Sequence, residues 1–335
     1  MADKPATIKD IAARVGVSNT TVSAVLGVSK SGHVRCSEAT RARILEAAAE
    51  MRYRPNRVAR SLRYQKTNVI GVYAARGHLN PYVTFTSQIL GGLRMGCDIE
   101  RKDLLLHNNY AGRSADEIYG ELADGRVDGL ILYTSLQDEL AERLAASHLP
   151  VVAIVDGLAG LPSVVVDDAG GSRLLARHLA ERGHRRIFYH ATSPALTSAE
   201  RRLEAFKAEA AACGMEILRY SPREQHYYLG RSDVEWLTEP REKRPTAGVC
   251  WNDLGAYKLL KLCREYGMRV PEDFAVVGFD DVQPPHNNPL RLTTIRAPWL
   301  DVARTAVELL VKRINGEDIP IETVLPVTLA PGDTA

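Results

Sequence analysis

Apolar side chains recur at helical spacing near the start of the chain, where residues 7–26 read TIKDIAARVGVSNTTVSAVL. The apolar positions that would share one helix face are Ile8, Ile11, Ala12 and Val15. Gly16 can supply a tight turn, and Ser18 can cap a second helix that runs to about Leu26. Two short helices joined in this way predict a helix-turn-helix motif, and the second helix has the position of a recognition helix.

A third amphipathic helix is predicted from Ser37 to Met51. Ser37 is a suitable N-cap, and Glu38 suits the positive end of the helix dipole. Tyr53 and Pro55 end the helix. The apolar face is predicted to consist of Ile44, Leu45, Ala48 and Met51.

The next segment, RPNRVARSLR, predicts a short basic helix. Asn56 can cap one turn from Arg57 to Arg63, which is too short to be stable alone because helix nucleation is costly. This turn should therefore fold only when it is docked. Its arginines can contact phosphates, while Ala59 and Leu62 share a face that can enter a minor groove. The alternative for Leu62 is packing beneath the following domain.

From Asn68 onward the pattern changes to short, β-rich apolar runs separated by helical stretches. These runs are residues 69–75, 103–108, 128–133, 151–155, 186–190, 247–251 and 275–279. Continuous apolar strands that alternate with helices indicate parallel, doubly wound sheets covered on both faces. The predicted fold is an all-α headpiece and hinge helix, followed by an α/β body of two lobes.

These patterns also predict the domain organisation. The chain ends shortly after a last strand-like run, ETVLPVTL, and the final segments are expected to cross between the lobes. The expected parts are a headpiece (1–55), a hinge helix (56–66), an N-terminal lobe (67–167 and 297–326) and a C-terminal lobe (168–296 and 327–335).

Charge supports this division. Residues 1–66 contain 13 Lys and Arg against 5 Asp and Glu, which leaves 30 against 36 in the remainder of the chain. The formal net charge of +2 thus hides a strongly cationic head on an anionic body. Only the head is expected to meet the phosphates of a nucleic acid.

The motifs GVSNTTVS, SEATR and RPNRVARSLR resemble the headpiece and hinge of the LacI/GalR family of bacterial transcription regulators. The resemblance extends over essentially the whole body, which is similar to periplasmic sugar-binding proteins. It implies a homodimer on a pseudo-palindromic DNA operator, with a recognition helix in each major groove. Paired hinge helices would open the central minor groove, and Leu62 lies where the family places an intercalating leucine.

DNA contacts are expected from the start of the second helix and from the hinge. Asn19 and Thr20 are the predicted base readers, since Asn pairs well with adenine. Ala24 stands where many relatives carry a polar reader, and offers at most a methyl contact to thymine. Ser18, Thr21 and Ser23 are interpreted as caps or phosphate contacts. The full predicted set is Thr7, Ser18, Asn19, Thr20, Thr21, Ser23, Ala24, Asn56, Arg57, Ala59, Arg60 and Leu62.

Contacts to a small-molecule effector are placed by family landmarks such as LPVVAIVD, CWNDLGAYKLL and VPEDFAVVGFDD. The matching residues are Asp156, Arg202, Asn252 and Asp280, with Tyr82, Tyr133 and Tyr228 as candidate stacking residues. Carboxylates, an amide and a guanidinium suit the paired hydroxyls of a sugar. Packing is an equal alternative for each tyrosine, and a cap or interlobe hydrogen bond is an alternative for Asp280. His190 replaces a residue that is often small in relatives.

Other classes of protein lack support in the sequence. It contains no GxxxxGK[ST], GxSxG or HExxH motif, and Gly91, Gly92 and Gly96 fall within a helical segment rather than in a dinucleotide-binding turn. Asp167 and Asp168 are interpreted as a turn. The five cysteines are scattered, so we expect reduced thiols, no metal site and no cofactor. No signal region or membrane span is apparent, which favours the cytoplasm.

The sequence therefore predicts a ligand-responsive transcription regulator, a repressor of sugar utilisation, that is not an enzyme. A dimer is favoured because no heptad tail follows the last strand-like run. The alternatives are a solute-binding protein or an α/β enzyme with an accessory DNA-binding head.

Overall fold

The computed structural model describes residues 6–27, 36–56, 59, 61, 64–75, 79, 84–108, 110–135, 138–191, 196–221, 229–282 and 289–335. The chain divides into two compact units, Met1–Thr67 and Asn68–Ala335, and each is described by itself.

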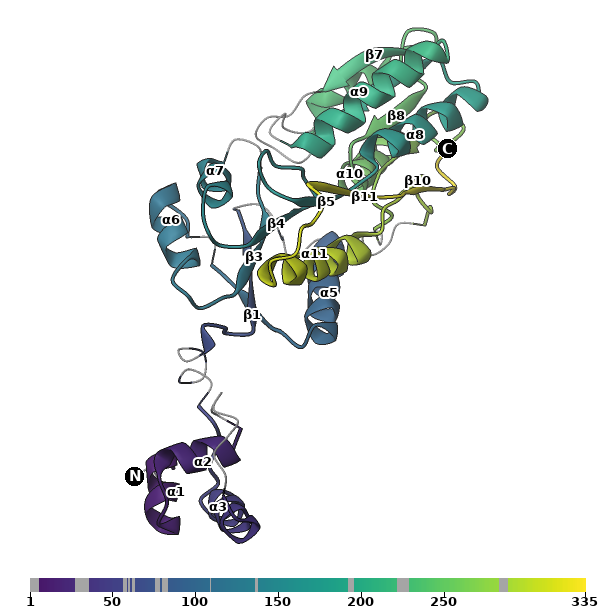
Figure 1. Ribbon diagram of the computed structural model, residues 1–335. Coiled ribbons are helices and arrows are strands. Elements are labelled where there is room, and N and C mark those ends of the chain that lie inside the picture. Colours follow the sequence, from purple (N-terminus) through teal and green to yellow (C-terminus); the bar gives the residue numbers. More distant parts are fainter. Residues whose placement is uncertain are drawn as a thin grey trace. The chain divides into compact units, whose positions relative to one another are not determined.

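The described residues of the first unit include the helices α1 (Ile8–Val15), α2 (Asn19–Val25) and α3 (Glu38–Glu50), as the sequence predicts (Figure 1). They pack around a small core, in which Ile11, Val22 and Ile44 are completely buried. One detail of the prediction is wrong. Leu45 remains 46% exposed, because it lies one residue, or about 100° of helix rotation, beyond Ile44. Ala47 occupies the apolar face instead.

Local capping explains why these helices begin and end where they do. The Thr7 hydroxyl accepts a hydrogen bond from the backbone N–H of Asp10, whose carboxylate accepts in return from the backbone N–H of Thr7. Ser18 and Ser37 cap α2 and α3 in the predicted way. Gly16 ends α1 at φ 73°, a left-handed conformation that glycine adopts without strain.

The second unit contains a six-stranded parallel sheet with the strand order β11-β5-β4-β3-β1-β2. Its strands are β1 (Val69–Ala74), β2 (Asp103–Leu106), β3 (Gly129–Tyr133), β4 (Val151–Ile154), β5 (Ser163–Val166) and β11 (Glu322–Leu325). Helices α5 (Thr84–Ile99) and α11 (Trp299–Ile314) pack on one face, and α6 (Ala115–Leu122) and α7 (Glu139–Ala145) pack on the other.

A second parallel sheet has four strands in the order β7-β6-β8-β9. These are β6 (Arg186–His190), β7 (Glu216–Ser221), β8 (Ala247–Cys250) and β9 (Ala275–Val277). Helices α8 (Asp168–Glu181) and α9 (Thr197–Ala212) cover one face, and α10 (Asp253–Glu265) covers the other. Two short 3₁₀ helices, η1 (Arg231–Asp233) and η2 (Glu235–Thr238), precede β8. The predicted α/β architecture with doubly wound parallel sheets is confirmed.

The run ETVLPVTL forms two strands rather than one. Pro326, which has no N–H for a sheet hydrogen bond, separates β11 from β12 (Thr328–Ala330). β12 pairs in antiparallel fashion with β10 (Thr294–Arg296), whereas β11 joins the six-stranded sheet. The chain thus runs from the four-stranded half of the body back to α11 and β11, and then returns.

The glycines of α5 allow close packing against α11, which confirms that they do not form a dinucleotide-binding turn. A Cβ atom on Gly92 would lie 2.2 Å from the carbonyl oxygen of Leu300, and one on Gly96 would lie 2.8 Å from Cβ of Val307. A Cβ atom on Gly91 would meet nothing within 4 Å. Gly92 and Gly96 therefore set the distance between the two helices.

Candidate functional sites

The start of α2 presents a polar surface. Ser18, Asn19 and Thr20 are all exposed, and they surround the N-terminal end of the helix, where backbone N–H groups favour a phosphate. The Ser18 hydroxyl is engaged locally, because it accepts a hydrogen bond from the backbone N–H of Thr21 at 3.1 Å. Asn19 and Thr20 are thus the exposed side chains with the best access to a base edge.

Two predicted contacts in α2 differ from this picture. Ser23 is only 5% exposed, so its side chain faces the inside of the headpiece and cannot contact a phosphate without a rearrangement. Ala24, one position further along the helix, is half-buried and keeps part of its methyl group accessible.

In the hinge, Asn56 Oδ1 accepts a hydrogen bond from the backbone N–H of Ala59 at 3.3 Å, which is the expected capping contact. Asn56 and Ala59 are both exposed. The predicted contacts Arg57, Arg60 and Leu62 lie outside the described residues.

Three predicted effector residues follow strands directly. Asp156 lies just beyond β4, Asn252 just beyond β8 and Asp280 shortly after β9. The carboxyl ends of parallel strands are the usual place for ligand-binding side chains in open α/β sheets. Arg202 joins this group from α9.

Arg202 is the centre of a buried network, with only 3% of its surface exposed. Its Nε donates to Asp168 Oδ1 at 2.7 Å, and its Nη1 donates to the carbonyl of Trp251 at 2.7 Å. Nη1 also lies 3.7 Å from Asp280 Oδ1, and the guanidinium stacks over the ring of Phe279 at 3.6 Å. The guanidinium is therefore held rigidly in the plane that these groups define.

Burial raises the pKa values of the carboxyl groups in this network. Burial raises the pKa of Asp168 to about 6, although the Arg202 guanidinium opposes this shift. Burial also raises the pKa of Asp280 well above its usual value, again against the effect of Arg202. Asp253, the first residue of α10, is fully buried nearby, and its pKa rises to about 7 through burial.

Sequence reasoning missed Asp168 and Asp253. The interpretation of the Asp167–Asp168 pair as a turn is correct for Asp167, which caps α8 by accepting from the backbone N–H of Gly170 at 2.8 Å. The neighbouring Asp168 points into the network instead. An acidic residue directly after a helix-capping residue at a strand end is the signal that could have found both, since Asp253 follows Asn252 in the same way.

Asp156 and Asn252 both act as helix caps. Asp156 Oδ1 accepts from the backbone N–H of Ser198 at 2.9 Å, and Asn252 Oδ1 accepts from the backbone N–H of Gly255 at 2.9 Å. Asp156 is almost completely buried, whereas Asn252 is partly exposed. Of the two, Asn252 has more surface to offer a ligand.

A cluster of aromatic side chains includes Tyr133, which lies at the carboxyl end of β3 in the six-stranded sheet. Tyr133 ends β3 and is 9% exposed, with the ring of Phe85 packed edge-on at 6.3 Å. Phe85 in turn packs edge-on against Trp299 at 5.0 Å. Packing thus accounts for most of the Tyr133 surface. Tyr82 and Tyr228 lie outside the described residues.

His190 ends β6 and is 1% exposed. Its Cδ2 lies 3.0 Å from the position that a Cβ atom on Gly255 would occupy. The imidazole therefore fills the space beside the first turn of α10, and a smaller residue there would enlarge that space.

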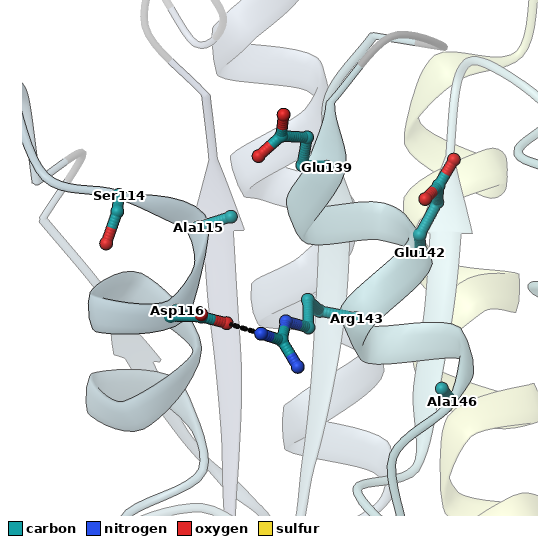
Figure 2. A pocket seen from close by; sticks show the side chains of 7 residues that line it. All are labelled: Ser114, Ala115, Asp116, Glu139, Glu142, Arg143 and Ala146. Carbon is teal, nitrogen blue, oxygen red and sulfur yellow. Dashed lines mark ion pairs between the residues drawn. The ribbon is translucent and has the colours of Figure 1, made fainter.

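A separate pocket of about 430 Å³ opens between α6 and α7. In Figure 2, Arg143 of α7 points at Asp116 of α6, with which it forms an ion pair, and Glu139 and Glu142 lie along α7. The remaining lining residues are Ser114, Ala115 and Ala146. None of the predicted site residues lies there.

Within the described ranges, no group of His, Cys, Asp or Glu side chains is arranged to hold a metal ion. All five cysteines are free thiols. No helix in the described part of the chain has the length and apolar character that crossing a membrane requires.

Comparison with known proteins decides the family. Residues 7–56 match the bacterial regulatory proteins of the lacI family, and residues 176–335 match a periplasmic binding protein-like domain. The HTH-type transcriptional repressor PurR of Aliivibrio fischeri strain MJ11 is 32% identical over 329 residues, or 93% of each chain. PurR of Mannheimia succiniciproducens is 30% identical over 333 residues, or 95% of each chain. This chain belongs to the lacI family.

Solved structures agree with this assignment. The lac repressor dimer bound to operator and the anti-inducer ONPF aligns with a TM-score of 0.81 and 26% identity, over 99% of both chains. The transcriptional regulator CelR in complex with cellobiose aligns with a TM-score of 0.71 and 27% identity, over 98% of this chain and 100% of CelR. The predicted family and the two-lobed body are confirmed.

The lacI-family protein described here is therefore a DNA-binding transcriptional repressor with a small-molecule effector, and it is not an enzyme. The solute-binding alternative fails because the headpiece itself matches the family.

Proposed function

We propose that this repressor is controlled by a carbohydrate that binds at the carboxyl ends of the strands, where Arg202, Asn252 and Asp280 lie. The observation that carries the proposal is the position of Asn252 and Asp280 shortly after the carboxyl ends of β8 and β9, with Arg202 fixed beside Asp280. A partly exposed amide next to a buried carboxylate can donate to and accept from neighbouring sugar hydroxyls.

Two related structures support a carbohydrate. CelR, at 27% identity, is in complex with cellobiose, and a periplasmic binding protein/LacI regulator from Alkaliphilus metalliredigens, at 26% identity, is in complex with D-xylulofuranose. Phe85, which is partly buried and packs edge-on against Tyr133 and Trp299, offers apolar surface near the strand ends, and this suits the C–H face of a sugar ring. Asp156, Tyr82 and Tyr228 remain further candidate contacts.

For DNA, we propose a cytoplasmic homodimer that reads a pseudo-palindromic operator. Asn19 and Thr20 contact base edges, while Thr7, Ser18 and Thr21 lie near the phosphates. Hinge residues Asn56, Arg57, Ala59, Arg60 and Leu62 occupy the minor groove, and Ala24 contributes only its methyl group. The lac repressor that aligns over 99% of this chain is a dimer bound to operator.

The first experiment selects bound sequences from a randomised duplex pool with the full chain at near-physiological salt. Recovery of a palindrome supports the dimeric operator complex, and an enriched sequence without symmetry contradicts it. If nothing is enriched, the selection is repeated with metabolite extract, which supplies a corepressor. Failure of both selections overturns the proposed mode of DNA binding.

The recovered operator then serves to test the effector. A panel of neutral mono- and disaccharides is added, and operator affinity is measured for the wild type and for Asn252→Asp. This variant keeps the acceptor that caps α10 but lacks the amide donor. We expect one sugar to change the affinity of the wild type and to act less on the variant, while Asn315→Asp, on an exposed residue after α11, behaves like the wild type. No response to any sugar overturns the carbohydrate proposal but not the DNA proposal.

A further inference from the structure

Two neighbouring loops carry a cluster of basic residues at the amino ends of β6 and β8 in the four-stranded sheet. Asn252 and Asp280 lie at the opposite, carboxyl ends of the strands. One loop, RGHRR, leads into β6, and the other, REKRPT, leads into β8. The loops are adjacent because the start of β6 pairs with the start of β8, where Ile187 lies opposite Ala247. We call this cluster the basic edge. It consists of Arg182, His184, Arg185, Arg186, Arg241, Lys243 and Arg244.

The guanidinium groups of the basic edge are anchored to neutral partners. Arg186 links the two loops, since its Nη2 donates to the carbonyl of Arg241 at 2.7 Å and its Nε donates to the carbonyl of Arg244 at 3.0 Å. Arg185 donates to the carbonyl of Ala180 at 3.0 Å. The others contact the carbonyls of Glu272 and Asp273 and the His178 ring. These contacts fix the side chains without neutralising them.

Among the described residues, none of the five arginines of the basic edge forms an ion pair. Arginines elsewhere on the same half of the body do so, for example Arg177 with Glu209 and Arg231 with Glu265. The contrast is marked because the chain beyond residue 66 has more acidic than basic residues. The basic edge is thus a concentration of positive charge on an otherwise anionic body.

The pKa values of two less exposed members, His184 and Arg244, agree with this description. The pKa of His184 is lowered, first by burial and then by the charges of Arg241, Arg182, His178 and Arg185. The pKa of Arg244 is also lowered, mainly by burial, and Arg241 and Arg186 contribute while Asp273 opposes them. Positive groups therefore repel one another at this edge.

We propose that the basic edge binds a phosphoryl anion. Several fixed guanidinium groups favour a multiply charged oxyanion. The planar fork of arginine matches two phosphate oxygens, and a single carboxylate would neutralise only one of the guanidinium groups. Arg182, Arg185, Arg241 and Lys243 are exposed and supply the accessible donors. The phosphoryl group can belong to a free metabolite or to a phosphorylated protein segment.

A compact anion fits better than a long nucleic acid. Three exposed carboxylates lie nearby: Glu181 at the end of α8, Glu242 in the second loop and Glu272 in the loop before β9. An extended track of DNA phosphates would meet these carboxylates, whereas one phosphoryl group can lie among the arginines and avoid them.

The test uses arginine modification by phenylglyoxal on the full chain, read peptide by peptide by mass spectrometry. Inorganic tripolyphosphate is the first probe and sodium chloride at equal ionic strength is the reference. At a probe concentration of ten times Kd, we expect Arg185 and Arg241 to react roughly tenfold more slowly, because only the free protein reacts. Arg177 and Arg231, exposed on the same half of the body, are internal controls and should react at an unchanged rate.

Two further probes distinguish the source of the anion. Protection by a phosphoserine peptide as well as by tripolyphosphate indicates a phosphorylated protein, and protection by tripolyphosphate alone indicates a free phosphoryl ligand. The proposal is overturned if only non-operator duplex DNA protects the basic edge. It is also overturned if each probe changes the reaction rates of Arg185 and Arg241 by no more than it changes those of the controls Arg177 and Arg231. In an Arg185→Gln/Arg241→Gln variant, calorimetric binding of tripolyphosphate should weaken at least tenfold relative to an Arg177→Gln/Arg231→Gln variant, which loses the same charge. Equal binding by both variants also contradicts it.

Discussion

The Asp156 carboxylate and the backbone N–H of Ser198 join the two halves of the body, at a distance of 2.9 Å. Asp156 follows β4 of the six-stranded sheet, whereas Ser198 lies in the first turn of α9, which covers the four-stranded sheet. Leu196 stands at the N-cap of α9 and provides no side-chain hydrogen bond. The cap of this helix is thus supplied by a residue from the other half. Thr197 Oγ1, which donates to the carbonyl of Gly157 at 2.8 Å, reinforces the same contact.

Replacement of Asp156 should weaken the body through the loss of this cap. We expect Asp156→Ala to lower the free energy of unfolding by about 1 to 2 kcal/mol, the usual cost of a lost N-cap. Asp156→Asn keeps an acceptor oxygen and should lose less than half of that. Urea unfolding measures both values, and hydrogen exchange at the amide of Ser198 reports on the cap itself. Equal losses in the two variants, with unchanged exchange at Ser198, would show that the carboxylate does not act as the cap.

This shared cap could not be predicted from the sequence, because Asp156 and Ser198 are 42 positions apart. Local rules did predict what depends on neighbours along the chain. The serine caps of α2 and α3, the turn at Gly16 and the alternation of apolar strands with helices follow from residues a few positions apart. Leu45 was placed wrongly, and the burial of Ser23 was not predicted, because the angular position of the core around a helix depends on tertiary packing.

The pair Gly91 and Gly92 tests the packing of α5 against α11. Gly92→Ala places a Cβ atom against the Leu300 carbonyl, so we expect a loss of about 1 to 3 kcal/mol in the free energy of unfolding. Gly91→Ala makes the same chemical change one residue earlier, where a Cβ atom has open space. It should leave stability unchanged or raise it by up to about 1 kcal/mol, through higher helix propensity. Thermal or urea unfolding of both variants would contradict this packing if the two changes had the same effect.

Arg202 should be important for the stability of the body as well as for ligand binding, because it is the cation among buried carboxylates. Arg202→Met leaves Asp168 and Asp280 without their charge partner, and we expect a loss of about 3 to 5 kcal/mol. In the double variant Arg202→Met/Asp168→Asn, part of this loss should be recovered, since one of the uncompensated charges is removed. The measurement is equilibrium unfolding in urea at pH 7. A double variant less stable than Arg202→Met would refute the ion-pair explanation.

Only part of the candidate effector site could be predicted from the sequence, for a physical reason. The strand-end positions of Asn252 and Asp280 follow from the alternation of strands and helices. Tertiary contacts decide how many hydrogen-bonding groups of a site residue the protein itself already uses. Arg202, for example, donates to Asp168 and to the Trp251 carbonyl. A pattern of residue types therefore locates the site but does not separate the residues that meet a ligand from those that position them.

Asp253 gives the body a defined dependence on pH. Its Oδ2 accepts from the backbone N–H of Val282 at 2.9 Å, and its Oδ1 accepts from the hydroxyl of Thr294. Burial raises its pKa from 3.8 to about 7, so the native state holds this proton more tightly than the unfolded chain does. Between about pH 4 and pH 7 the unfolded chain loses its proton first. The stability that this group contributes is complete below pH 3.8 and is lost as the pH rises to about 7.

The variant Asp253→Asn removes the titration and should flatten this part of the stability profile. A shift of one pKa unit corresponds to about 1.4 kcal/mol. Between pH 4.5 and pH 7.5, the free energy of unfolding of the wild type should therefore fall by on the order of 3 kcal/mol more than that of the variant. Urea unfolding at both pH values provides the comparison. Titrating groups remote from Asp253 cancel because both proteins share them, whereas Asp280, whose pKa the Asp253 charge raises, titrates together with Asp253. Asp273→Asn is the control. Its partly exposed carboxylate has a pKa lowered to about 2 by Arg269, so this variant should retain the wild-type slope in that window. Parallel profiles for the wild type and Asp253→Asn would mean that Asp253 does not hold its proton in the native state.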